Sequence, residues 1–113
     1  MTPAELLEQA AEKVRAGWCQ GISSNDRGQL CADGAMTQMS GLDGLTVKEW
    51  LTTPDYKVFE AASAALLNHV REKYDKPYTF IPEWNDESER TQEQVVEAML
   101  QTAKDLRNQE VTP

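Results

Sequence analysis

The sequence predicts a mainly α-helical domain of about five helices, with a small β-hairpin or extended segment near residues 18–30. Two observations support this fold class. Helix-start signatures occur four times, each a Thr followed directly by Pro or, three residues later, by Glu or Gln. Each start is followed by apolar residues at helical spacing, and glycines lie beyond several expected ends. One such signature is weak, whereas four in one short chain favour an α-rich domain.

The first two helices lie in the N-terminal third. Thr2 is expected to cap the first helix, with Glu5 reaching back to the Thr2 amide, and the helix runs to about Ala16. Cys31 opens a short second helix that ends before Gly41. Their apolar positions are Leu6, Leu7, Ala10, Ala11 and Val14, then Ala32, Ala35, Met36 and Met39.

Three further helices are expected in the second half. A brief helix follows the capping box of Thr46 and Glu49, and a long one begins at Thr53-Pro54 and ends near Tyr74. The last helix spans about residues 91–107. The apolar positions of the three are Val47, Trp50 and Leu51; Phe59, Ala62, Leu66 and Val70; and Val95, Val96, Met99, Leu100, Ala103 and Leu106. Each stripe is wide enough to pack against neighbouring helices.

Two segments interrupt the helical pattern. The first contains the polar turn Asn25-Asp26-Arg27-Gly28, across which residues 22–24 and 29–30 are placed to pair as a hairpin. The second is a β-prone run, residues 78–81, which Pro82 ends. This run either lies beside the hairpin or crosses the core as extended chain.

Length and charge narrow the functional classes. The chain of 113 residues is expected to form one domain over residues 1–113, with a frayed tail at 109–113. The net charge of −8 argues against direct binding to nucleic acid or anionic lipid. No apolar run reaches a membrane span and the N-terminus does not resemble a signal peptide, so a cytoplasmic location is expected.

Two cysteines and the one histidine are candidates for thiol chemistry. A thiol hydrolase needs a thiolate, an imidazole and a group that orients the imidazole. Here Cys19 or Cys31 is the candidate for the thiolate, His69 for the imidazole, and Asn85 or Asp86 for the orienting group. Cys31 is the better nucleophile by position, because a helix N-terminus favours a thiolate. The competing interpretation is that both cysteines are small buried hydrophobes and that His69 is a partly packed helix residue.

No metal site or cofactor is predicted. Cys19 and Cys31 do not form a Cys-x-x-Cys pair, and a single histidine cannot complete a tetrahedral set. The glycines do not follow the spacing of a phosphate-binding loop. Reduced thiols are the simplest state for a cytoplasmic chain, with a Cys19–Cys31 disulfide as an open alternative.

Trp84-Asn85-Asp86 has two interpretations. In the structural one, the two polar residues shape a turn before the last helix, and Trp84 fills the core while its N–H finds a carbonyl. In the functional one, Trp84, Asp86, Glu87 and Glu89 form an acidic rim, anchored by the indole, that binds a partner protein.

Four segments resemble a family of uncharacterised small proteins from actinobacteria and their phages. They are Gly17-Trp18-Cys19-Gln20-Gly21, Asp26-x-Gly28, Cys31-Ala32-x-Gly34-Ala35, and Trp84-Asn85-Asp86 with Arg90-Thr91. The similarity covers most of the chain in the same order, except residues 40–60. It implies a small cytoplasmic, phage-encoded protein and transfers no catalytic residue.

The expected function is that of an acidic cytoplasmic accessory protein that acts without catalysis, by contact with an unidentified protein such as a host factor. One alternative is a thiol-dependent enzyme that uses Cys31 or Cys19 with His69. A second is a DNA mimic, which requires the carboxylates of residues 86–93 to share one face with others at phosphate-like spacing.

Overall fold

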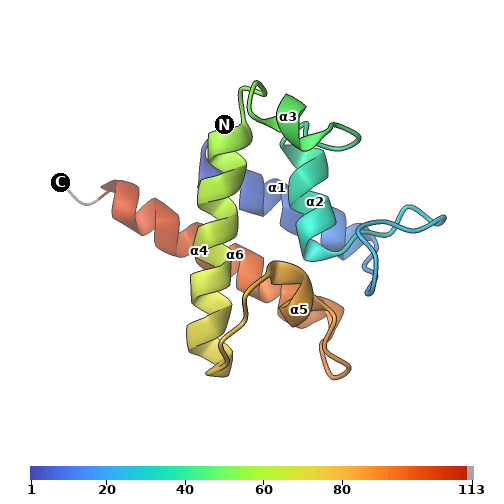
Figure 1. Cartoon of the computed structure of the whole chain (residues 1–113). Helices are drawn as coiled ribbons and strands as arrows, with labels where there is room; N and C mark the ends of the chain where they lie inside the picture. Colours follow the sequence, from blue (N-terminus) through green and yellow to red (C-terminus); the bar gives the residue numbers. More distant parts are fainter. Residues whose placement is uncertain (112–113) are drawn as a thin grey trace.

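The structure is a computed structural model that describes the backbone of residues 1–111 and the side chains of residues 1–109. Six α-helices and two isolated β-bridges occur in this part of the chain (Figure 1). The helices are α1 (Pro3–Ala16), α2 (Ala32–Met39), α3 (Val47–Trp50), α4 (Tyr56–Tyr74), α5 (Ile81–Asn85) and α6 (Gln92–Val111). The predicted mainly α class is therefore confirmed, with one short helix more than the sequence indicated.

Helices α1 and α6 form the most extensive helix pair. The two helices run antiparallel. Gln92 at the start of α6 donates a hydrogen bond of 2.7 Å to the Val14 carbonyl near the end of α1, and Arg107 late in α6 forms a 2.6 Å ion pair with Glu8, which lies earlier in α1. Helices α2 and α4 both pack against α1, and α4 crosses the pair (Figure 1). One interface therefore holds together two helices that lie far apart in the sequence, α1 and α6.

The core contains residues from helices near both ends of the sequence and from the segments between helices. The apolar stripe predicted for the first helix is buried without exception, and the α6 positions Val95, Met99 and Ala103 face it. Trp84 of α5 is the largest fully buried side chain. The other large fully buried side chains are Leu6, Leu7, Met36, Leu42, Leu66, Met99, Val14, Val70, Val95 and Asn85.

Three of the four predicted helix starts are confirmed. The Thr2 and Thr46 hydroxyls accept the Glu5 and Glu49 amides at 3.1 and 3.2 Å, and each Glu returns a bond to the cap amide. Thr91 forms the same reciprocal pair with Gln94, at 3.2 and 3.0 Å. These pairs satisfy amides that the first helical turn leaves unbonded.

The start predicted at Thr53-Pro54 is wrong by two residues. Helix α4 begins at Tyr56, and its N-cap Asp55 makes no side-chain cap bond. The Thr53 hydroxyl instead donates 3.1 Å to the Glu49 carbonyl, so it satisfies the end of α3. The Thr53 hydroxyl therefore bonds to the end of α3 and not to the start of α4. The residues expected to start α4, Thr53 and Pro54, lie instead in the turn between the two helices.

The segment before the last helix also differs from the prediction. Phe80 is extended, but Ile81 already begins α5, and Pro82 lies in its first turn, where a missing N–H is tolerated. The Glu83 carboxylate accepts the Thr79 and Phe80 amides at 3.0 and 2.9 Å, which organises this turn.

The two remaining expectations concern residues 18–30 and the tail. Residues 18–30 form bends and the expected polar turn at 25–28, with two isolated bridges, Trp18 to Leu30 and Ser24 to Leu30, rather than a regular hairpin. The expected frayed tail is helical through Val111, and its last residues, 112–113, lie outside the described part of the chain.

Candidate functional site

Three of the segments that carry the family resemblance meet at Asn85. This contact region, here called the Asn85 junction, comprises residues 17–21, 31–34 and 84–86. The Asn85 Oδ1 atom accepts the Trp18 indole N–H at 2.9 Å and the Ala32 amide at 3.1 Å. Its Nδ2 donates to the Cys19 carbonyl at 3.1 Å and to Asp86 at 2.9 Å. The buried amide therefore has all four of its hydrogen-bonding positions filled.

Neighbouring residues extend the Asn85 junction. The Gln20 side chain donates to the carbonyls of Asn85 and Glu87 at 3.0 and 2.8 Å, and the Asp86 carboxylate accepts the Gly21 amide at 2.9 Å. These bonds join two segments that lie about 65 positions apart. The junction thus fastens the loop after α1 to the end of α5.

Gly34 sets the approach of residues 18–30 to α2. A Cβ atom at position 34 would overlap the carbonyl oxygen of Ser23, which is rigid backbone. The same carbonyl accepts the Cys31 amide at 3.1 Å. Glycine is therefore required here by close contact, and not by an unusual backbone angle.

Both cysteines are buried free thiols within this junction. The Cys31 sulfur caps α2 by accepting the Gly34 amide at 3.2 Å, while Cys19 donates to the Ile22 and Gln29 carbonyls at 3.4 Å. Burial raises the pKa of the Cys31 thiol despite the Gly34 hydrogen bond, and burial with the nearby Asp86 charge raises the pKa of Cys19. The surroundings therefore favour the protonated, unreactive thiol.

His69 lies elsewhere, on α4 against α6. It lines a small cavity with Thr102, Asp105 and Leu106, and its Nε2 atom is buried with no hydrogen-bond partner among the described residues. Burial and the Lys73 charge lower its pKa, so the neutral imidazole is favoured. The structure thus brings Cys19, Cys31, Asn85 and Asp86 together and leaves the candidate base out.

The predicted acidic rim lacks its aromatic anchor. Trp84 is fully buried, which confirms the structural interpretation of the indole and corrects the expectation that it meets a partner at the surface. Its N–H, expected to reach a carbonyl, has no acceptor within the described side chains and backbone. The Glu87 carboxylate accepts hydrogen bonds from the Tyr78 hydroxyl, from Arg90 at 3.1 Å and from Lys76 at 2.7 Å. Glu89 alone of the four faces solvent without a hydrogen bond or ion pair in the region described.

The contacts of Asp86 and Glu87 also concern the DNA-mimic alternative, which needs the carboxylates of residues 86–93 to be arranged like phosphates. Hydrogen bonds to Gly21 and Asn85 hold Asp86, and two cations flank Glu87. The Lys76 hydrogen bond is the largest cause that lowers the pKa of Glu87. These two carboxylates therefore stabilise the fold, and no observation here favours a DNA mimic.

Arg90 is a buried cation that the sequence patterns did not single out. Its guanidinium lies 4.1 Å from the centre of the Tyr74 ring and 5.2 Å from that of Trp84. It donates 3.0 Å to the Trp84 carbonyl and also contacts Glu87. Ring faces and an adjacent carboxylate compensate the buried charge. The Arg90-Thr91 pair among the segments of the family resemblance was the one sequence feature that marked this position.

A pocket that the sequence did not predict opens between α2, α3, α4 and the start of α5. It is called here the aromatic pocket, and its volume is about 380 Å³. The residues that line it are Asp33, Trp50, Phe59, Ser63, Ala64, Leu67, Thr79, Phe80, Ile81 and Pro82. Trp50 and Phe59 meet edge to face at 5.9 Å, and Phe80 is 64% exposed at the rim. This pocket combines apolar walls with a few polar side chains, as ligand sites commonly do.

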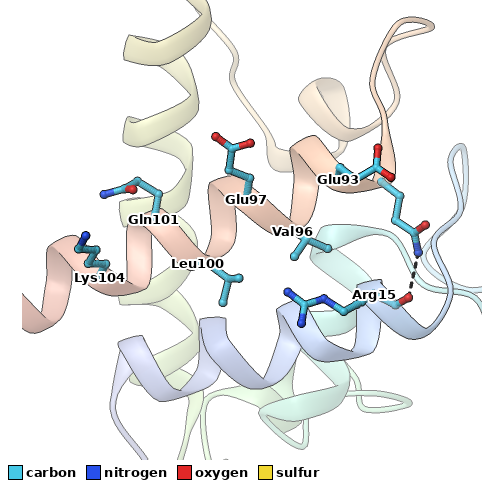
Figure 2. A pocket seen from close by; sticks show the side chains of 8 residues that line it. Arg15, Glu93, Val96, Glu97, Leu100, Gln101 and Lys104 are labelled. Carbon is cyan, nitrogen blue, oxygen red and sulfur yellow. Dashed lines mark hydrogen bonds between the residues drawn. The ribbon is translucent and has the colours of Figure 1, made fainter.

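A second hollow, the α1–α6 groove, follows the surface of the main helix pair. Figure 2 shows Val96 and Leu100 of α6 between the two helices, with Arg15, Glu93, Glu97 and Lys104 around them. Its volume of about 490 Å³ is larger, and it is lined by four charged side chains, two amide side chains and the apolar Val96 and Leu100. Gln92, which also lines it, is already bound to the Val14 and Arg15 carbonyls. The groove therefore has fewer fixed features for recognition than the aromatic pocket.

The described residues form neither a metal-binding cluster nor a membrane-spanning helix. Within them no three Cys, His, Asp or Glu side chains are grouped so that they can hold a metal ion. Likewise, none of the helices in that part of the chain has the length and apolar character needed to span a bilayer.

Comparison with known proteins identifies a family. Residues 1–105 match the model of DUF6197, a family of unknown function, and the chain belongs to that family. No curated protein and no solved structure shows significant similarity to the chain. The resemblance noted in the sequence is confirmed at the level of a family whose function is unknown.

Proposed function

We propose that this chain is a non-enzymatic accessory protein that binds a protein partner through the aromatic pocket. The exposure of Phe80 beside Trp50 and Phe59 is the observation that supports this proposal. Isolated apolar side chains are normal on protein surfaces, but an exposed aromatic ring at the mouth of an apolar pocket is typical of binding sites.

Helix α3 extends the apolar surface near this pocket. Val47 and Leu51 are 71% and 67% exposed, and they lie four residues apart on the short segment that supplies Trp50. Residues at this spacing share one face of a helix. A partner that covers the pocket mouth and this face would bury apolar area that the chain alone leaves in water.

Thiol chemistry receives less support than binding. Cys19 and Cys31 are buried in hydrogen bonds of the Asn85 junction, and burial raises their pKa. His69 lines a different cavity, on the α4–α6 side. A thiol enzyme would need a thiolate within reach of its base. The junction is better explained as a structural fastening.

The proposed setting is the cytoplasm. The two free, buried thiols suit a reducing compartment, in which disulfides are rare. With a net charge of −8, the chain is suited to a partner with a basic surface, since opposite charges accelerate encounter. In line with a phage origin, we propose a host-cell protein as that partner.

Site-specific photocrosslinking in cells of the native source tests the proposal. Benzoylphenylalanine at Phe80 is expected to give a discrete crosslinked product, which a second substitution, Trp50→Ala, reduces severalfold. The matched control places the same group at Gln101, which is exposed in the α1–α6 groove. A product at Gln101 and none at Phe80 would overturn the proposal, because the partner face would then lie on the other groove.

A further inference from the structure

The aromatic pocket contains an unpaired carboxylate. Asp33, in the first turn of α2, lines the pocket and is partly buried, yet its side chain makes no hydrogen bond or ion pair among the described residues. Burial raises the pKa of this carboxyl. A carboxylate without a partner in such surroundings is destabilised unless a cation or donor meets it.

A second polar group in the pocket also lacks a partner. The Ser63 hydroxyl oxygen is buried, and no donor or acceptor of the described chain reaches it. Asp33 lines the pocket from α2 and Ser63 from α4, and the Ser63 hydroxyl oxygen is covered by surrounding atoms in the free chain. The remaining walls include the rings of Trp50, Phe59 and Phe80, whose faces attract cations.

From these groups we infer that the aromatic pocket binds the side chain of a lysine on the partner protein. The alkyl stem of a lysine packs on the apolar walls, and its ammonium donates to the Asp33 carboxylate. This inference rests on the proposed function and specifies the chemistry of the partner at the same pocket. The acidic surface of the chain favours the approach of such a basic segment.

The helix dipole alone does not account for the position of Asp33. An acidic residue in the first turn is favoured by the partial positive charge of the helix N-terminus, and that effect operates equally at a fully exposed position. Here the Asp33 residue instead forms part of the lining of a pocket whose walls are largely aromatic and apolar. The burial is unfavourable in the free chain, and a bound ammonium would offset it.

The test is a titration of the ¹⁵N-labelled protein followed by NMR. The probe is n-butylammonium, which represents the end of a lysine side chain, and the neutral comparison is 1-butanol. We expect butylammonium to shift the resonances of Asp33, Ser63 and the Trp50 indole, with a Kd about tenfold lower than that of butanol. Equal affinity for the two probes would overturn the inference.

Variants separate a local charge contact from the general charge of the protein. Asp33→Asn is expected to remove the preference for the ammonium, whereas Asp43→Asn, at an exposed carboxylate in the loop after α2, should leave it unchanged. Loss of the preference in both variants would show a long-range effect and contradict the inference. Thr79→Lys, on the exposed rim, supplies a tethered ammonium and should block the probe even if Asp33→Asn fails to fold.

A peptide comparison distinguishes a protein lysine from a free amine. Acetyl-Leu-Lys-Leu-amide should shift the same resonances more strongly than its norleucine counterpart. Binding of butylammonium without binding of this peptide would assign the pocket to a small amine and overturn the lysine assignment. If the charge preference fails while the Phe80 crosslink persists, only this inference is lost; if the crosslink fails, the proposed function is lost.

Discussion

The indole nitrogen of Trp18 lies 2.9 Å from the side-chain oxygen of Asn85, across 67 positions of the sequence. The same oxygen accepts the Ala32 amide at the start of α2. One buried amide side chain therefore fixes the loop after α1, the start of α2 and the end of α5 relative to each other. These residues belong to the segments on which the family resemblance was noted in the sequence, and in this structure they hold the helices together.

Replacing Asn85 with Ala should destabilise the fold strongly. The change leaves the Trp18 N–H, the Ala32 amide and the Cys19 carbonyl without their partner in a buried site. Buried polar groups that lose their bonds make such changes costly, so we expect a loss of about 2–4 kcal/mol in urea unfolding. Asn68→Ala, at an exposed position on α4, is the control and should change stability by less than about 0.5 kcal/mol. Similar losses in both variants would show that the junction bonds contribute little.

Replacing Gly34 with Ala should also destabilise, through overlap with the Ser23 carbonyl. Because that neighbour is backbone, the loop must shift and its bond to Cys31 is strained, at a cost of about 1–3 kcal/mol. Gly17→Ala is the matched control, since its new methyl group would meet the flexible Gln29 side chain at 3.1 Å. Thermal unfolding of both variants measures the difference, and a Gly34 variant as stable as the Gly17 variant would contradict the close-contact argument.

The two thiols should react slowly in the folded protein. Burial raises the pKa of both Cys19 and Cys31, and the thiolate is the reactive form. At pH 7.5 an aromatic disulfide reagent should modify them at least about tenfold more slowly than it modifies the urea-unfolded chain. Rapid modification of either thiol in the native state would restore the thiol-enzyme alternative as a serious hypothesis.

The stabilising effect of Glu87 should depend on pH. The hydrogen bond from Lys76, with smaller effects of Lys76 and Arg90 charges, lowers the pKa of Glu87 below its usual value of 4.5. A lowered pKa in the folded state means that the ionised group stabilises the fold above the unfolded-state pKa, and that this contribution is lost as the pH falls through the folded-state value. Glu87→Gln should therefore cost about 1 kcal/mol near neutral pH, and this difference should shrink below about pH 4.

Urea unfolding at pH 7, 5 and 3 measures this effect. Glu89→Gln is the control, because Glu89 is an exposed neighbour in the same loop. Its variant should follow the wild type within about 0.5 kcal/mol at each pH. A constant difference for Glu87→Gln from pH 7 to 3 would show that the carboxylate charge is not the source of the stabilisation.

The helix starts could be predicted where the hydrogen-bonding partners lie three residues apart. Thr2 with Glu5, and Thr91 with Gln94, each contain both members of the reciprocal pair within one turn. Thr53 failed as a marker because it lies between two helix ends, and its hydroxyl donates to the Glu49 carbonyl of α3 instead of capping α4. A Thr hydroxyl therefore predicts a helix cap reliably only where a single helix end lies within its reach.

The candidate site was predictable to a smaller extent. The unusual residues of the Asn85 junction could be recognised by type, but the pairing of Trp18 with Asn85 depends on how the α1–α6 pair positions the loops. The aromatic pocket needed Trp50, Phe59 and Phe80 from three separate segments, and none of these carries a local signature of binding. The sequence left Trp84 open to two interpretations, a core residue or a surface anchor, whereas the structure buries that ring and exposes Phe80.

The antiparallel pairing of α1 with α6 sets an order of events during synthesis. Helix α1 is complete at residue 16, but the α6 residues that cover its apolar face extend to about position 103. At about 5–20 residues per second, the ribosome leaves that face uncovered for roughly 4–17 s. The part of the apolar face of α1 that packs on α6 therefore stays uncovered in the newborn chain until the α6 residues emerge. Production of the protein should be more sensitive to premature termination and to chaperone supply than its small size suggests.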